Sequence, residues 1–236
     1  MRPYQPSHAA PWHTGHMSRR GSAARREAPE HRWPPIVAVL VAVVLWVLLP
    51  PYFFPPLQWG AAIVCALLIV PLVILNPRHM TRQTAWSRVL SLALALVVLL
   101  FTQVLLVQLV FELLTAPPAT GVIILVAALQ LWATNAIAFG LVFWELDAGG
   151  PVVRASTTRP AVEMDFQFPQ YTLPGGASWR PRFFDYLYVS ITAGLAFSSA
   201  DAVPLTRRAK AFLAIEALSA FIISVLVIAR AVSAVT

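Results

Sequence analysis

Long runs of apolar residues constrain this sequence more than any other feature. The runs cover 36–49, 57–75, 89–114, 121–144 and 211–232, and a helix needs about 20 such residues to cross the hydrocarbon core of a bilayer. Only 11% of the residues are charged and 58% are hydrophobic, whereas roughly 25% of a soluble domain is charged. We therefore expect an all-α integral membrane protein.

The first apolar run, 36–49, is short enough to resemble the core of a signal peptide. The stretch after it, Pro50–Pro56, offers no small-residue cleavage pattern, and aromatic residues on either side of the run are typical of membrane interfaces. We therefore expect a retained span over about 34–54.

Residues 1–32 form a basic tail with six arginines and two glutamates and no apolar periodicity, so we expect this segment to be disordered. Its arginines would contact anionic lipid, and no nucleic-acid partner is expected. His13 and His16 have a spacing that could hold a metal on a helix, but no third ligand lies nearby. The single cysteine, Cys65, offers no disulfide framework. We predict no metal and no cofactor.

The basic residues are spread unevenly over the connecting segments and therefore indicate topology. Three arginines lie within 76–88, four within 145–182 and three basic residues within 207–210, whereas 50–56 and 115–120 carry none. If the N-terminus is cytoplasmic and four spans follow, the first two of these segments are cytoplasmic as well. The distribution favours a multi-pass protein with a cytoplasmic N-terminus.

The short apolar segment 183–197 does not fit a full crossing. Its 15 or so residues would reach only about 22 Å as a helix, which is less than the hydrocarbon thickness. A crossing would also export the basic residues of 207–210, whereas a re-entrant segment keeps 16 of the 17 basic residues on one face. The prediction is five transmembrane helices plus a re-entrant pore-type half-helix.

Residues in and after this segment keep the spacing of a known pattern: Asp185, Leu187, Tyr188, Ser190, Asp201, Pro204, Thr206, Ala209, Lys210 and Glu216-Ala217-Leu218. The pattern resembles the pore helix, filter region and inner helix of bacterial potassium channels, written DxLYxS, TVGYGD, PxTxxA(R/K) and EAL. The resemblance covers about a fifth of the chain, residues 183–232. In it, Asp185, Tyr188, Ser190 and Glu216 stand at positions that support the filter.

This resemblance implies a domain organisation. Residues 33–120 would form a three-helix N-terminal transmembrane region and 121–236 a channel-like pore domain. Within that domain we expect an outer helix over 121–144, a loop over 145–182, a re-entrant helix and turn over 183–206 and an inner helix over 207–233. The resemblance also implies a homotetramer in the lipid bilayer that passes small cations.

The filter itself departs from the family, because Ala196-Phe197-Ser198-Ser199-Ala200 stands where TVGYG would lie. Both glycines are replaced, and their backbone conformations cost other residues about 1–2 kcal/mol each. A ladder of carbonyl ligands is therefore not expected. Rings of Ser198 and Ser199 hydroxyls, with Asp201 at the mouth and Phe197 as a constriction, would give weak cation selectivity or none.

The orientation is a second departure, because potassium channels insert the pore loop from outside and the charges here place it on the cytoplasmic face. Ionotropic glutamate receptors resemble such an inverted pore. If 36–49 does not span, the usual orientation is restored but the arginines of 76–88 are exported. The chain also resembles uncharacterised bacterial membrane proteins with a WELD-GGP stretch, here 144–151, and an FPQ stretch, here 168–170. That resemblance implies the bacterial inner membrane.

Each candidate has a plainer structural interpretation. Ser198, Ser199, Asp201 and Thr206 could simply break and cap two helices, and Glu216 could pair with the basic residues of 207–210. The amides of the spans could hold helices together or line a path; they are Gln103, Gln108, Gln130 and Asn135.

The acidic residues between the fourth and last spans could form carboxylate pairs for acid–base catalysis or a charge-balanced loop; they are Glu145, Asp147, Glu163 and Asp165. No nucleophile or phosphate-binding glycine loop accompanies them, so no enzyme is expected. The aromatic part, 166–171, would pack under the re-entrant turn. An alternative to a pore is a non-conducting scaffold that binds a partner through its cytoplasmic loop.

Overall fold

The computed structural model describes residues 31–50, 53–75, 85–115, 121–156, 164–174, 176, 179–196 and 202–233. Its elements in chain order are α1 (Trp33–Val47), α2 (Pro55–Leu75), α3 (Ala85–Thr115), α4 (Gly121–Leu146), the 3-10 helix η2 (Asp147–Gly149), α5 (Pro151–Ser156), β1 (Phe166–Gln167), the 3-10 helix η3 (Pro169–Thr172), α6 (Phe183–Ala196), β2 (Val203–Pro204) and α7 (Arg207–Ser233).

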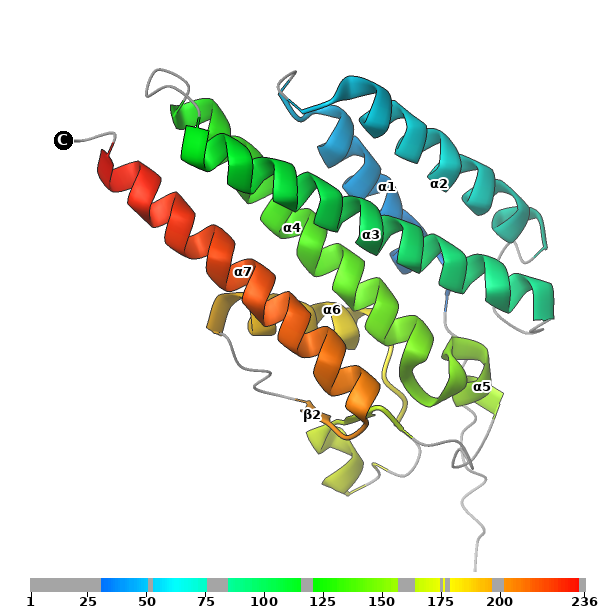
Figure 1. The fold of residues 1–236 in the computed structure, drawn as a ribbon. Helices are drawn as coiled ribbons and strands as arrows, with labels where there is room; N and C mark the ends of the chain where they lie inside the picture. Colours follow the sequence, from blue (N-terminus) through cyan, green and yellow to red (C-terminus); the bar gives the residue numbers. More distant parts are fainter. Residues whose placement is uncertain are drawn as a thin grey trace, which may run out of the picture.

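Five of these helices, α1, α2, α3, α4 and α7, run alongside one another as a bundle (Figure 1). Four of them, α2, α3, α4 and α7, are long and apolar enough to cross a membrane, while α1 and α6 are shorter apolar helices. The prediction of a helical membrane protein is thus confirmed. Helix α1 has 15 residues and ends at Val47, before the end of the span expected over 34–54.

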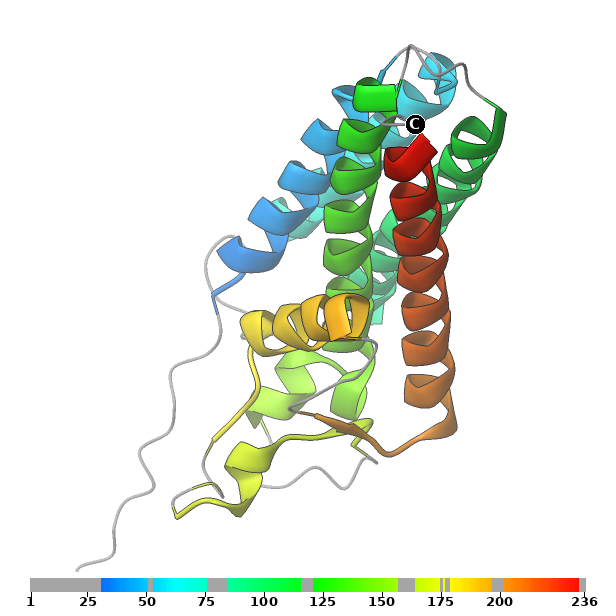
Figure 2. The same cartoon turned by 90° about the vertical axis from the view of Figure 1, so that its left-hand side faces the viewer.

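The central element of the bundle is α4, which packs against α1, α3, α6 and α7. Aromatic contacts reinforce the bundle, for example between Trp46 of α1 and Phe101 of α3, whose ring centroids lie 4.8 Å apart. Helix α6 lies across α4 and α7 near the end of the bundle at which α7 begins (Figure 2). Gly140 of α4 allows the close approach of α6, because a Cβ there would lie 3.0 Å from the Cα of Leu187.

Proline and glycine set several helix boundaries. Pro34 and Pro35 occupy the first turn of α1, where their missing N–H groups cost nothing. The end of α4 leads into three residues with positive φ, namely Ala148 at 50°, Gly149 at 81° and Gly150 at 97°. This left-handed stretch stops the helix and turns the chain into α5.

The segment expected as a loop over 145–182 holds regular structure in its described part. It contains η2, α5, β1 and η3. Strand β1 pairs antiparallel with β2, which follows α6 in the chain. The register places Phe166 opposite Pro204 and Gln167 opposite Val203. This small ribbon ties the loop to the residues that precede α7, a connection that hydropathy does not reveal.

Candidate functional site

A buried carboxyl group lies inside the bundle where α6 meets α7. Glu216, six residues after Lys210 on α7, is 1% exposed. The hydroxyl of Ser190 on α6 hydrogen-bonds the Oε1 of Glu216 and lies 2.8 Å from the carbonyl oxygen of Ala136 on α4. One polar contact therefore joins three helices, and the Oε2 of Glu216 has no hydrogen-bond partner among the described residues.

Amide and hydroxyl groups continue this polar region toward α3. The Nε2 of Gln103 on α3 donates to the Oδ1 of Asn135 on α4 at 2.8 Å. The hydroxyl of Ser219 on α7 lies 3.2 Å from the Oε1 of Gln103. We call Gln103, Asn135, Ser190, Glu216 and Ser219 the intramembrane polar cluster. The prediction that Gln103 and Asn135 hold helices together is confirmed.

The intramembrane polar cluster lies well inside the bundle along the helix axes. At about 1.5 Å per residue, Glu216 is about 9 Å along α7 from Lys210. By the same rise, Ala136 is about 15 Å along α4 from Leu146, the last residue of that helix. An ionisable group at such a depth is costly in a bilayer and is by default a candidate for function.

The other residues expected to support a filter take different positions. Asp185 stands in the first turn of α6 and its Oδ2 accepts a hydrogen bond from the backbone N–H of Arg182 at 2.6 Å, so it caps that helix. Tyr188 is half exposed on the outer side of α6. Of these four residues, Ser190 and Glu216 form a hydrogen bond with each other. Of the filter-like stretch, the backbone of Ala196 ends α6 and residues 197–201 lie outside the described part.

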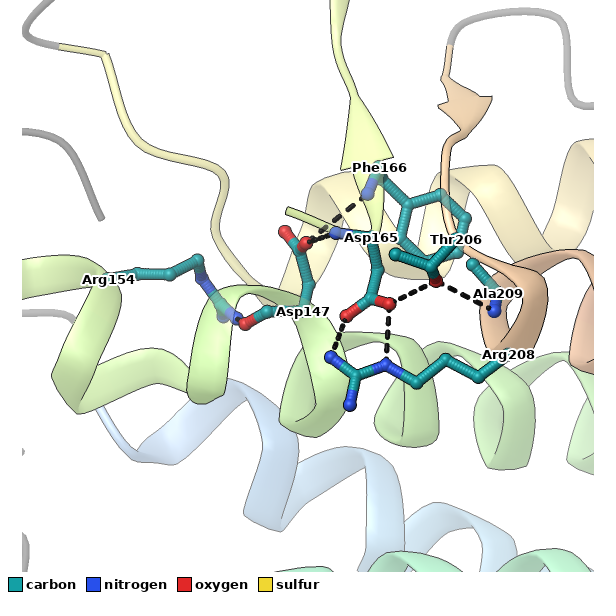
Figure 3. A network of polar contacts seen from close by, with 7 residues as sticks. All are labelled: Asp147, Arg154, Asp165, Phe166, Thr206, Arg208 and Ala209. Carbon is teal, nitrogen blue, oxygen red and sulfur yellow. Dashed lines mark hydrogen bonds and ion pairs between the residues drawn. The ribbon is translucent and has the colours of Figure 1, made fainter. Parts of the chain in front are cut away.

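A second polar arrangement, centred on Asp165, connects the loop to the start of α7 (Figure 3). Asp165 is 1% exposed and accepts two hydrogen bonds of 2.6 Å from the Nε and Nη2 of Arg208. Its Oδ1 also accepts a hydrogen bond from the hydroxyl of Thr206, whose oxygen in turn accepts from the backbone N–H of Ala209 at 3.2 Å. Thr206 therefore caps α7, as its residue type predicts.

Asp147 anchors the other side of the same loop (Figure 3). Its Oδ1 accepts hydrogen bonds from the backbone N–H groups of Asp165 at 2.7 Å and Phe166 at 3.2 Å. Its Oδ2 accepts a hydrogen bond from the hydroxyl of Tyr186 on α6. The Nη1 of Arg154 donates to the carbonyl oxygen of Asp147 at 2.6 Å. We call Asp147, Arg154, Asp165, Tyr186, Thr206 and Arg208 the edge network.

Aromatic side chains fill the space between the edge network and α6. Phe168 packs edge-on against Tyr186 with ring centroids 5.4 Å apart, and Tyr171 packs against Trp179 at 5.2 Å. Burial is the main cause that raises the pKa of Tyr171 to about 12. We expected 166–171 to pack under the re-entrant turn, but residues 197–201 of that turn lie outside the described part of the chain; the contact that the structure shows is with Tyr186 of α6.

The edge network is the part of the site that sequence reasoning missed. Asp147 and Asp165 were expected in a charge-balanced loop, but both are buried and each accepts several hydrogen bonds. From the sequence we considered that Glu216 could pair with the basic residues of 207–210. In the structure, Arg208 pairs with Asp165 instead. The available signal was the alternation of the polar residues Asp165 and Gln167 with Phe166 and Phe168, which favours a packed segment.

No family model matches this chain, and no curated protein or solved structure matches it. Within the described residues, no group of three histidine, cysteine or acidic side chains is arranged to hold a metal ion. The functional assignment therefore depends on the geometry of the intramembrane polar cluster, on α6 and on the distribution of charge.

Proposed function

We propose that this chain is a channel-like membrane protein that forms a weakly selective cation pore as a homo-oligomer, a tetramer by analogy with potassium channels. The observation that carries the proposal is the packing of the half-length helix α6 against two spanning helices, α4 and α7, with the Ser190–Glu216 contact at their junction. An outer helix, a half-helix and an inner helix in this order make up the channel unit that the sequence resembles.

The depth of α6 supports a half-membrane helix. Its residue Ser190 contacts α4 and α7 about 14 to 15 Å along those helices from their ends at Leu146 and Arg207, inside the region that the apolar spans define. Helix α6 has 14 residues, about 21 Å in length, which is too short to cross. Irregular backbone after such a helix is tolerated in a membrane only where protein buries it or water fills the space beside it.

The positions of the basic residues support a cytoplasmic location for the end of the bundle that carries the edge network. Helices α1, α3 and α7 begin at this end and α4 terminates there, as the colour order in Figure 1 shows. Eight described basic residues belong to it: Arg32, Arg88, Arg154, Arg180, Arg182, Arg207, Arg208 and Lys210. Arg230 lies in the last turns of α7, at the opposite end. By the positive-inside rule, the N-terminus and the entrance of the proposed pore beside α6 face the cytoplasm of a bacterial cell. This topology needs α1, with its flanking residues up to about position 54, to be a fifth span.

Residues 196–201 would form the narrow part of the proposed pore. They connect α6 to the segment before α7 and carry the hydroxyls of Ser198 and Ser199 and the carboxylate of Asp201. Rings of such side chains attract cations with little discrimination between them. Glu216 would hold α6 on α7 and so keep this stretch in place.

Currents in planar bilayers test the proposal. We expect purified protein to give cation currents that Asp201→Asn reduces severalfold, because a ring of mouth charges is lost. Glu112→Gln is the matched control, since Glu112 lies near the far end of α3 and the same charge is removed. A protein that is monomeric or dimeric in detergent and in nanodiscs would contradict an axial pore.

A second function is favoured by the lipid-facing surface of α7. Between Ala211 and Val232 every exposed side chain of α7 is apolar, so this face offers no polar lining to a water-filled path. The same unit could therefore serve as a non-conducting scaffold whose cytoplasmic end binds a partner. Silent bilayers combined with a stoichiometric partner that is lost on Asp165→Asn would favour this second function.

A further inference from the structure

A cavity of about 50 Å³ opens at the end of the bundle where α1 and α3 begin and α2 and α4 end. None of its lining residues belongs to the intramembrane polar cluster. Its deeper wall is apolar and is formed by Val39, Ile69, Leu72, Leu94 and Leu141, and its mouth carries Arg32, Ser87, Arg88, Ser91 and Glu145. A cavity with one apolar and one charged end matches an amphiphile better than a fully polar solute.

The charged groups of this mouth do not balance one another. Glu145 is 6% exposed, receives a hydrogen bond from Ser91 and lies in the field of Arg32, Arg88 and Arg154. Of the charged residues that line the cavity, two are arginines, Arg32 and Arg88, and one is an acid, Glu145.

Of the two arginines that line the cavity, Arg88 is the one placed to take a further acceptor. Arg88 is exposed at the rim, where one of its nitrogens holds the carbonyl oxygen of Gly149. A guanidinium has five N–H donors and suits phosphate geometry. The site therefore favours an additional anion.

We propose that this cavity binds an anionic phospholipid, with its phosphate at Arg88 and part of an acyl chain against Val39, Leu94 and Leu141. Basic pockets between spanning helices on the cytoplasmic side are suited to phosphate head groups. The apolar depth distinguishes a lipid from free phosphate, which would use the mouth alone. Because α1, α2, α3 and α4 all contribute to the wall, the lipid would hold α1 and α2 on the rest of the bundle.

Native mass spectrometry tests this with protein in nanodiscs of phosphatidylglycerol diluted in phosphatidylcholine. We expect phosphatidylglycerol to remain bound after detergent release, with an affinity about tenfold lower for Arg88→Gln, since one charge-assisted contact is lost. Arg88→Lys retains the charge and should recover part of the affinity. Arg207→Gln is the matched control, because Arg207 is exposed at the same end of the bundle and is not part of the cavity.

Three results would overturn the proposal. Equal losses for Arg88→Gln and Arg207→Gln would mean that general surface charge retains the lipid. Equal retention of phosphatidylcholine would remove the role of the anion. Displacement of the lipid by inorganic phosphate at a similar concentration would show that the apolar wall contributes nothing. A circular dichroism melt of each variant in detergent separates a loss of binding from a loss of fold.

Discussion

Replacing Gly140 by alanine should push α6 away from α4. The added Cβ would lie 3.0 Å from the Cα of Leu187 and 3.4 Å from its backbone nitrogen, and these atoms belong to the backbone of α6. Carbon atoms in contact normally lie about 3.5–4.0 Å apart, so the whole helix must shift by about half an ångström. Overpacking of this kind costs about 2 kcal/mol, while replacing glycine by alanine within a helix contributes about 1 kcal/mol in favour. The net loss in the free energy of unfolding is about 1 kcal/mol.

The matched control for this substitution is Gly60→Ala in α2. A Cβ at Gly60 has open space around it, with nothing within 4 Å. This variant should show only the favourable helix term, so the two substitutions should differ by about 2 kcal/mol, the overpacking cost itself. Equilibrium unfolding in mixed micelles, followed by circular dichroism, measures both. If Gly140→Ala is stabilised as much as Gly60→Ala, the close packing of α6 on α4 is refuted.

Further predictions concern the two polar arrangements and the aromatic cluster. Asp165→Asn should lower the free energy of unfolding by about 2 kcal/mol, a value discounted because Arg208 is half exposed; combining it with Arg208→Gln should add little, and additive losses would argue against the pair. Ser190→Ala should cost about 1–3 kcal/mol because a buried acceptor on Glu216 loses its partner, and Ser190→Ala with Glu216→Leu should recover much of the loss; micelle unfolding titrations check both. Because the pKa of folded Tyr171 is about 12 and that of an unfolded tyrosine is about 10, the folded state holds its proton longer, and stability should fall as the pH rises from 10 to 12. Tyr171→Phe should flatten this part of the pH profile, and an unchanged slope would argue against burial of the hydroxyl.

The sequence identifies the spanning helices because their signal is local. A run such as 89–114 needs only hydropathy to be recognised as a span, and α3 covers it from Ala85 to Thr115. The pairing of Gln103 with Asn135 was also within reach, since polar residues in spans usually meet one another. The cap at Thr206 follows from residue type and position.

The edge network could not be predicted because its contacts join residues far apart in the chain. Asp165 meets Arg208 across 43 positions and Asp147 meets Tyr186 across 39. Phe166 and Phe168 favour a packed segment beside Asp165, but the sequence neighbours of the two carboxylates do not show which partners they meet. The prediction of α6 as a short membrane helix came from its length and from the basic residues after it, but its contact with Gly140 depends on packing alone.

Cysteine accessibility in intact cells tests most directly whether α6 belongs to a half-membrane segment between two spans. The buried Cys65 is first replaced by alanine, and single cysteines are then placed by Arg82→Cys and Ser199→Cys, with Val232→Cys at the far end of α7. We predict that an impermeant maleimide added outside the cell labels only Val232→Cys, and that inverted membranes label the other two. Labelling of Ser199→Cys from outside, together with Arg82→Cys from inside, would mean that α6 crosses the membrane and would contradict the pore-type unit.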